Sequence, residues 1–402
     1  MRMLFAVAPG YGLMLPIVPL MWAARSAGHE ILVATTSEMT EVGARAGLPI
    51  VDVFPHRDVW AELVNAVFHG GEGELPEEYR LAQKNDNPFG LFTLTMTEGT
   101  IAAGRMFGAD LVVHTSDHMA GWLTAAALGV PALEVGNRVS WSMRDEWFRA
   151  EHGITGTDEI SVSLRAKLDI GEDDPTVVAR IDPRAPSMGG LSADEPDLRD
   201  GLPWWSMRFV PYNGGAVVPE WALRRPERPR VCVTLGTVVP LISGTSDLSA
   251  VLSALGELDV DVVLAAGTAD LSELGALPGN VRSVGFLPLS TFLPSCSLIV
   301  HHGGSGTTAA PLYYGIPQLV LPSFADNFLS AQRVVDRGVG LSHDPKTVDA
   351  ATLRASVERL LSEPTFAAAA WEVSAEMASQ PSPAAIIERL TQAMSALKNR
   401  RA

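Results

Sequence analysis

The sequence is short of cysteine and of basic charge, and each shortage excludes a class of protein. Two cysteines, Cys232 and Cys296, occur among 402 residues, which is too few for a disulfide scaffold or a structural zinc site. Lysine and arginine total 30 against 46 aspartates and glutamates, and the formal net charge of −16 repels nucleic-acid phosphate and anionic membranes. The single basic cluster, Lys398, Arg400 and Arg401, lies at the C-terminal tip. We therefore expect no nucleic-acid partner and no membrane partner.

Residues 3–24 contain no formally charged side chain, so a signal peptide or a membrane helix has to be considered. The same stretch contains three prolines and two glycines: Pro9, Pro16, Pro19, Gly10 and Gly12. These residues interrupt a continuous apolar helix and favour a strand, a tight loop and a helix that starts at a proline. We expect a soluble, cytoplasmic protein with reduced cysteines.

Short apolar runs alternate with helical segments along both halves of the chain, a pattern typical of parallel sheets covered by helices on both faces. The expected strands are Met3–Ala8, Glu30–Ala34, Ile50–Val53, Asp110–His114, Ala132–Val135, Arg230–Leu235, Val260–Ala266, Val281–Val284, Ser297–His302 and Gln318–Leu321. At about 100–200 residues per domain, the length predicts two or three domains. The predicted fold class is α/β, with two doubly wound, Rossmann-like domains and a ligand cleft between the carboxyl ends of their sheets.

A proline-rich stretch from Pro211 to Arg230 changes the composition and indicates a linker. The N-terminal domain is placed at residues 1–215, the linker at 216–229, the C-terminal domain at 230–382 and a final helix at 383–402. Residues 55–100 and 137–205 show weak periodicity, contain many of the aromatic residues and are expected as long loops. Long loops in a compact domain often have a functional role, and aromatic insertions can form a pocket for a large apolar ligand.

The most informative segment is IVHHGGSGTTAAPLYYGIPQLVLP, from Ile299 to Pro322. A strand is expected to end at His301, and the glycines behind it let the backbone approach a ligand closely. Successive N–H groups at the start of the next helix form a site for an anion, for which a diphosphate is the natural occupant. His301 is expected to donate to phosphate, and its neighbour His302 to be a packed histidine. A glycine turn with a purely structural role is the alternative.

The motif HHGGSGT, followed by GIPQLVLPSFADN, resembles the nucleotide-sugar signature of the family 1 glycosyltransferases with the two-domain GT-B fold, in particular the natural-product enzymes of antibiotic pathways. The phrase MRFVPYNGGAVVPEW is similar to that of transferases decorating aromatic polyketides, such as those of the nogalamycin and tetracycline pathways. The resemblance covers the whole chain. It implies an inverting, metal-independent glycosyltransferase that moves a deoxysugar from a TDP-sugar to a hydrophobic aglycone, with an aromatic polyketide as the expected acceptor. The nucleotide-sugar is then a co-substrate, and no cofactor is needed.

The same resemblance implies a role for each matching residue of the C-terminal half. Phe286 corresponds to the aromatic residue that stacks on the base, and Asp326 to the acidic residue that binds sugar hydroxyls. Asn327 replaces the commoner glutamine, which fits a deoxysugar with fewer hydroxyls or a shifted loop. The implied donor-site residues are Gly236, Thr237, Phe286, Leu287, His301, Gly304, Ser305, Gly306, Thr307, Asp326 and Asn327.

The first loop departs from the family pattern. Family members commonly have Gly-His-x-x-Pro there, with the histidine as general base, whereas this sequence has leucine at position 13, and leucine cannot accept a proton. Three explanations are open. Asp117 and His118, after the fourth strand, take over as catalytic residues; or the acceptor is a phenol or ring carbon that needs little help; or the chain is a non-catalytic nucleotide-sugar-binding auxiliary subunit. A nucleotide-sugar epimerase of the same fold is a further alternative, but it would need carboxylates around the sugar.

The acceptor is expected against the N-terminal half, on the first loop and the aromatic-rich segments. Glu134 ends a buried strand at the same cleft edge, where it is either a base or a carboxylate bonded to a loop. The acceptor-site candidates are Tyr11, Leu13, Trp60, Phe68, Phe92, Glu134 and Trp141. No histidine spacing indicates a metal site. The final helix is expected to cross back onto the N-terminal domain, as in the family, and the Ala-rich C-terminal helices are compatible with a homodimer.

Overall fold

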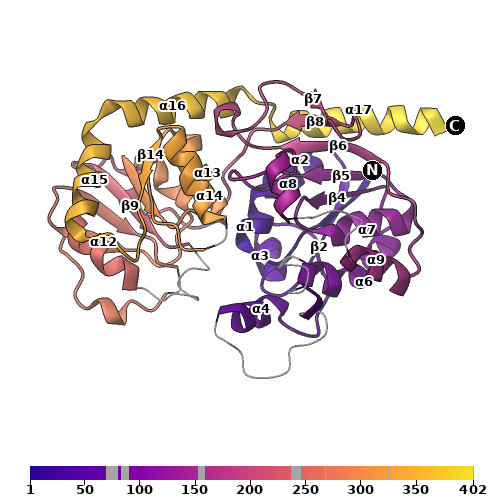
Figure 1. The fold of residues 1–402 in the computed structure, drawn as a ribbon, viewed down its shortest axis with the longest axis horizontal. Coiled ribbons are helices and arrows are strands. Elements are labelled where there is room, and N and C mark those ends of the chain that lie inside the picture. The colour runs from indigo at the N-terminus through magenta and orange to yellow at the C-terminus, as the bar shows by residue number, and fades with distance from the viewer. Residues whose placement is uncertain are drawn as a thin grey trace.

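The computed structural model describes residues 1–68, 80–82, 90–152, 159–236, 246–267, 269–324 and 326–401. Two lobes lie side by side, each built around one sheet with helices on its faces (Figure 1). The strand orders are β3-β2-β1-β4-β5-β6-β8-β7 and β11-β10-β9-β12-β13-β14. In the described residues every strand pair is parallel except β7 with β8. The predicted fold class, two doubly wound α/β domains, is confirmed.

The first lobe is formed by residues from the N-terminal half of the chain. Its strands are β1 (Arg2–Ala6), β2 (Glu30–Thr35), β3 (Ile50–Asp52), β4 (Leu111–Thr115), β5 (Ala132–Val135), β6 (Val177–Asp182), β7 (Glu195–Pro196) and β8 (Pro203–Ser206). Its helices are α1 (Tyr11–Met14), α2 (Val18–Ser26), α3 (Met39–Arg45), α4 (Val59–Phe68), α6 (Gly90–Phe107), α7 (Met119–Leu128), α8 (Glu146–His152) and α9 (Glu159–Lys167). The central strand β4 is buried along its whole length, including His114 and Thr115, which follow its apolar run Leu111–Val113.

The second lobe repeats this plan with a smaller sheet. Its strands are β9 (Arg230–Thr234), β10 (Asp261–Leu264), β11 (Val281–Ser283), β12 (Leu298–His301), β13 (Gln318–Val320) and β14 (Gly340–Ser342). Its helices are α12 (Ser246–Gly256), α13 (Ser305–Tyr314), α14 (Asn327–Asp336), α15 (Ala350–Ser362) and α16 (Pro364–Ser379). A short helix, α10 (Glu220–Leu223), lies in the proline-rich connection.

Two segments expected as loops are regular structure instead. The strands β6 and β8 extend the first sheet beyond β5, and the 18-residue helix α6 crosses a segment rich in threonine and glycine. Thr95, Thr97 and Thr100 bond the carbonyls three or four residues earlier, and Gly99 lets the helix pass Val53, whose carbonyl oxygen a Cβ there would approach to 2.0 Å. Tertiary packing therefore overrides the weak helix propensity of this segment.

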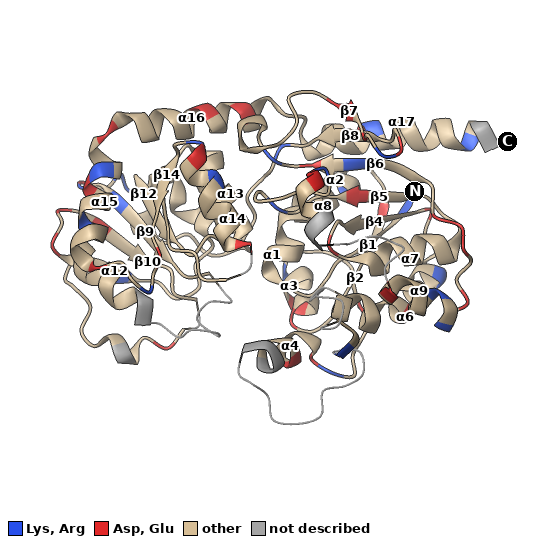
Figure 2. Ribbon diagram, viewed as in Figure 1, with Lys and Arg blue, Asp and Glu red and all other residues tan. Residues whose placement is uncertain are grey.

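The last helix, α17 (Pro383–Arg401), leaves the second lobe and lies along the first (Figure 1). Ile386, Ile387, Leu390 and Met394 are buried in the same core cluster as β1 and α2. Acidic and basic residues are interspersed over both lobes (Figure 2). Among the described residues, none of the helices combines the length and the apolar character needed to cross a membrane.

The two lobes also share an apolar interface. Val139, Met188 and Phe209 of the N-terminal half pack in one cluster with Leu312 of α13 and Val334 of α14. Loops at the carboxyl ends of β5, β12 and β13 meet beside this cluster, and this edge of an α/β sheet is where ligands bind.

Candidate functional site

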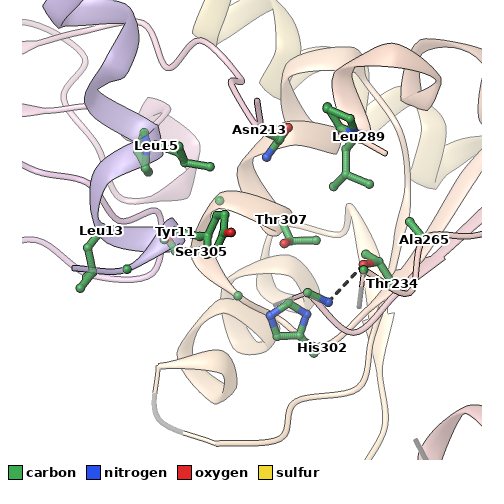
Figure 3. A pocket seen from close by; sticks show the side chains of 18 of the residues that line it. Tyr11, Leu13, Leu15, Asn213, Thr234, Ala265, Leu289, His302, Ser305 and Thr307 are labelled. Carbon is green, nitrogen blue, oxygen red and sulfur yellow. Dashed lines mark hydrogen bonds between the residues drawn. The ribbon is translucent and has the colours of Figure 1, made fainter. Parts of the chain in front are cut away.

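A cavity of about 260 Å³ lies between the lobes and is lined by both. The N-terminal half contributes Gly10, Tyr11, Gly12, Leu13, Leu15, Pro16, Trp60, Arg138, Phe209, Tyr212 and Asn213. The C-terminal half contributes Thr234, Gly236, Ala265, Gly267, Gly285, Phe286, Leu287, Pro288, Leu289, His302, Gly304, Ser305, Gly306, Thr307, Phe324, Asp326 and Asn327. Figure 3 shows Tyr11 and Leu13 on α1, Leu15 directly after it, and His302 and Thr307 on the opposite lobe. Among these described residues the lining includes one carboxylate, Asp326, and one histidine, His302.

The first wall of the cavity is α1, which follows β1 through a short loop. The backbone N–H groups of Leu13 and Met14 donate to the Gly10 carbonyl and start the helix. Leu13 is buried and packs in a cluster with Phe92 and Trp60. The position at which the resemblance implies a histidine is thus filled by an apolar side chain.

The opposite wall is the start of α13. Gly303 has φ 89°, and a Cβ there would lie 2.8 Å from the Asn327 carbonyl oxygen, so the turn after β12 requires glycine. The next four residues, Gly304 to Thr307, line the cavity, and a Cβ at Gly306 would meet nothing within 4 Å. The helix N-terminus and its backbone N–H groups therefore offer an anion site that opens into the cavity.

The two adjacent histidines occupy the reverse of their expected positions. His301 Nε2 lies 2.8 Å from Gln318 Oε1, and its Nδ1 accepts from the Gly303 N–H at 3.0 Å. Both ring nitrogens are engaged inside the sheet, and burial lowers the pKa of His301 to about 3. His301 is therefore the packed histidine and does not line the cavity. A strand alternates its side chains between two faces, which places one histidine inward and the other outward; the motif alone does not reveal which.

His302 is the histidine that lines the cavity. A Cβ at Gly236 or Gly304 would lie 2.4 or 2.3 Å from its ring atoms, so these glycines provide the space that the ring occupies. Its Nδ1 has no hydrogen-bond partner among the described residues. Burial lowers the pKa of His302 to about 4, so the ring is neutral at pH 7 in the unliganded protein. A bound anion would supply the missing partner and favour the protonated ring.

Asp117 and His118 follow β4, as expected, but their side chains do not reach the cavity. Asp117 is buried and accepts from Arg138 Nη2 at 3.2 Å. His118 is fully buried, neither ring nitrogen has a partner among the described residues, and burial lowers its pKa to about 4. Arg138 lines the cavity while Asp117 does not.

Arg138 is a cavity residue that sequence reasoning missed. Its Nη2 contacts Asp117 and its Nη1 lies 3.4 Å from Asp326 Oδ2. Burial alone would lower the pKa of this guanidinium, but the charges of Asp326 and Asp117 more than offset that effect, and the pKa is raised. No motif surrounds Arg138, and its partners lie 21 and 188 residues away, so no sequence signal pointed to it.

The remaining acceptor candidates divide between the cavity and the core. Tyr11 and Trp60 line the cavity, and the Tyr11 ring lies 6.4 Å from that of Phe286 on the opposite lobe. Phe92 is buried behind Trp60, with the two rings stacked at 6.1 Å. Three predicted residues therefore require correction: Phe92, Trp141 and Glu134 do not line the cavity.

The causes are local packing. Trp141 stacks on Phe148 at 4.0 Å. Glu134 lies 3.3 Å from Arg180 of the neighbouring strand β6, so its carboxylate is paired within the sheet rather than bonded to a loop. Thr237 and the side chain of Phe68 lie outside the described residues. Phe209, Tyr212 and Asn213 line the cavity, although none of them was predicted as a site residue. Across the described parts of the chain, no group of three or more His, Cys, Asp or Glu residues is placed to hold a metal ion.

Two family profiles match the chain. The N-terminal domain of the erythromycin biosynthesis protein CIII-like proteins matches residues 22–236, and their C-terminal domain matches residues 249–393. Among curated proteins, the elloramycin glycosyltransferase ElmGT of Streptomyces olivaceus is 36% identical over an alignment of 406 positions that covers 97% of each chain.

Two solved structures are similar over nearly the whole chain. The glycosyltransferase SnogD of Streptomyces nogalater has a TM-score of 0.80 at 33% identity and covers 98% of this chain and 99% of its own. The glycosyltransferase SsfS6 of Streptomyces sp. SF2575, complexed with thymidine diphosphate, has a TM-score of 0.75 at 31% identity with the same coverage. The similarity therefore extends over both lobes.

Proposed function

Because this chain belongs to the erythromycin biosynthesis protein CIII-like family and is a glycosyltransferase, we propose that it transfers a deoxysugar from a TDP-sugar to a hydrophobic natural-product aglycone. The expected acceptor is an aromatic polyketide of an antibiotic pathway, and the expected outcome is inversion at the anomeric carbon. The similarity to an elloramycin glycosyltransferase supports the acceptor class. The thymidine diphosphate bound to SsfS6 supports the nucleotide.

The observation that carries this proposal is a glycine-rich anion site facing an apolar wall across one cavity. We assign the diphosphate to the residues from Gly304 to Thr307 and to His302, in place of His301. Phe286, which is half exposed, is assigned to the base, and Asp326 and Asn327 to the sugar. The Asn327 amide nitrogen is buried without a partner among the described residues, which fits a ligand contact.

The proposed transfer reaction follows from the two facing walls of the cavity, α1 and the start of α13. The acceptor binds against Leu13 and Trp60 and attacks the anomeric carbon from the face opposite the diphosphate. The helix N-terminus and His302 stabilise the charge that develops on the leaving diphosphate, and such preorganised electrostatic stabilisation is usually the largest contribution to catalysis. Closure of the lobes keeps water from the donor and limits hydrolysis.

The acceptor deprotonation step favours an acidic acceptor. Among the described cavity residues, the N-terminal half provides neither a carboxylate nor a histidine, and leucine stands at the usual base position. A phenol ionises near pH 10 and needs less assistance than an alcohol. The geometry supports this explanation better than the Asp117–His118 base, which stays a prediction.

Calorimetric titration with TDP and UDP tests the donor assignment on wild type, His302→Asn and, as the matched control, His301→Asn. We expect TDP to bind the wild type with micromolar affinity and UDP more weakly. The His302 variant should lose at least tenfold in affinity, and the folded His301 variant should bind TDP within about threefold of wild type. If wild type binds neither nucleotide, only the fold assignment survives.

Consumption of TDP-sugar then separates the three functional classes. A transferase consumes it only when an acceptor is present, and an epimerase converts it without one. An auxiliary subunit does neither alone. Conversion in the absence of any acceptor would therefore overturn the transferase assignment.

A further inference from the structure

Four consecutive residues after β5, from Asn137 to Ser140, contact three of the segments that line the cavity. The Asn137 amide donates to the Leu13 carbonyl at 3.2 Å. The Val139 N–H donates to Ser305 Oγ at 2.7 Å, and Ser140 Oγ donates to Asp326 Oδ2 at 3.0 Å. With the Arg138–Asp326 pair, this segment links α1 at Leu13, the anion site at Ser305 and the proposed sugar site at Asp326.

We propose that Arg138 is a positioning residue that, together with Ser140, orients Asp326 toward the donor sugar and makes sugar recognition depend on closure of the lobes. This inference rests on the proposed function. In this inference the N-terminal half takes part in donor binding, and Asp117 holds Arg138 in position.

Two residues of the first lobe orient the carboxylate of Asp326. Arg138 and Ser140 both contact Oδ2, so in the described structure Oδ1 is the oxygen left for a ligand. Asp326 itself lines the cavity. Two donors on one oxygen fix the carboxylate rotamer, and a fixed acceptor binds a sugar hydroxyl without first losing side-chain freedom.

The ion pairs of Arg138 with Asp117 and Asp326 are largely buried. The Arg138 side chain is 10% exposed, that of Asp117 0% and that of Asp326 19%. Buried ion pairs are screened by solvent much less than surface pairs, so the contacts with a carboxylate on each side hold the Arg138 guanidinium in place. Asp117 therefore anchors Arg138 from the first lobe while Arg138 reaches across to Asp326 in the second.

The nucleotide of the donor is assigned to the second lobe, whereas the sugar site also depends on residues of the first. Phe286 and the residues from Gly304 to Thr307 belong to the second lobe, so TDP can bind there without Arg138. The sugar contact at Asp326 is completed only by residues of the first lobe. A change at Arg138 should therefore weaken the TDP-sugar much more than TDP.

The test measures dissociation constants of TDP and of TDP-L-rhamnose, as a TDP-deoxysugar probe, by calorimetry on the full-length protein. We expect Arg138→Met to weaken TDP-rhamnose at least tenfold while TDP stays within twofold, and Arg138→Lys to recover part of the loss. Asp326→Asn should give the same pattern, and the double variant of the two should add little to either single change.

A second variant distinguishes a loss of folding from a specific loss of sugar affinity. Arg138→Met leaves the buried Asp117 carboxylate without its ion-pair partner and with only the Asn137 amide as donor among the described residues. The double variant Asp117→Asn/Arg138→Met removes both charges and should regain stability without regaining sugar affinity. An unchanged TDP-rhamnose affinity in either folded variant overturns the inference. A wild type that binds TDP-rhamnose no better than Asp326→Asn does also overturns it. A wild type that does not bind TDP at all overturns the proposed function instead.

Discussion

The backbone N–H of Val139 donates a hydrogen bond to the hydroxyl of Ser305 across the two lobes, at 2.7 Å. Val139 follows β5 of the first lobe and Ser305 begins α13 of the second, and both residues are buried. The Ser305 backbone lies at the proposed diphosphate site while its side chain is held by the other lobe. Ser305 therefore belongs to the proposed diphosphate site through its backbone and holds the two lobes together through its side chain.

Replacing Ser305 by alanine should destabilise the protein by about 1–3 kcal/mol, because the buried Val139 N–H loses its acceptor. TDP affinity should fall less than threefold, since backbone N–H groups bind the phosphate. Urea unfolding and calorimetry measure the two effects. Thr307→Ala is the matched control, because Thr307 lies on the same helix end and lines the cavity but makes no interlobe bond that the structure describes; its stability should change by less than about 0.5 kcal/mol.

The crossing helix α17 should contribute to the stability of the first lobe. Leu390 is fully buried in the core that includes β1 and α2, so Leu390→Ala should cost about 2–5 kcal/mol in free energy of unfolding. Lys398→Ala, near the end of the same helix, should cost less than about 0.5 kcal/mol. Equal effects of the two substitutions in urea unfolding would show that the helix does not pack as described.

The architecture was predictable because its signal is local. Continuous apolar runs fix β1, β2, β4 and β5 to within two residues of their expected bounds, since a strand buried on both faces must be apolar throughout. The strand β6 was not predicted because VVARID contains two charged residues, Arg180 and Asp182. In the folded chain Arg180 pairs with Asp197 and Asp182 with Arg144. A long-range partner leaves no trace in the local pattern.

The site was predictable only in part, for the same reason. HHGGSGT marks the anion site because glycine and a helix start are local requirements, and the family assignment confirms the resemblance that this motif indicates. Which histidine faces the cavity depends on the phase of β12: the sequence predicts a phosphate contact for His301, whereas His302 lines the cavity. Arg138 reaches the cavity through Asp117 and Asp326, contacts that only the folded chain brings together.

Three buried histidines predict a loss of stability in mild acid. Burial lowers the pKa of His301 to about 3 and that of His302 and His118 to about 4, whereas an unfolded histidine titrates near 6.5. Because each folded pKa lies below the unfolded one, this contribution to stability is complete above pH 6.5 and is lost as the pH falls toward 4. For one histidine, a fall of the pKa from 6.5 to about 4 corresponds to about 3 kcal/mol.

Urea unfolding between pH 8 and pH 4.5 measures this effect. We expect the free energy of unfolding to be nearly constant down to pH 6.5 and to decrease steadily below it. His118→Leu removes one of the three groups and should reduce the slope in acid. A wild-type stability that is flat from pH 6.5 to 4.5 would contradict the prediction.

Introducing the family's histidine tests the acidic-acceptor explanation. Leu13 is 4% exposed and packs against apolar side chains, so Leu13→His should cost about 1–3 kcal/mol in stability. Turnover of a phenolic acceptor should not rise more than threefold, because the phenol needs little help. Leu13→Met is the control, since it keeps an apolar side chain of similar volume. A tenfold or larger gain in turnover at pH 7 would show that a missing base limits the reaction.

His118→Leu distinguishes a catalytic from a structural role for the pair after β4. Both ring nitrogens of His118 are buried without partners among the described residues, so a leucine there should raise the free energy of unfolding at pH 7 by about 1–2 kcal/mol. Turnover should stay within threefold, whereas a general base contributes about 10²–10⁴-fold. Asp117→Asn should behave differently and raise the KM for the donor, because Asp117 holds Arg138. If His118→Leu and Asp117→Asn both lower kcat by 10²-fold or more with the donor KM unchanged, the pair is the base and the positioning role of Asp117 is wrong.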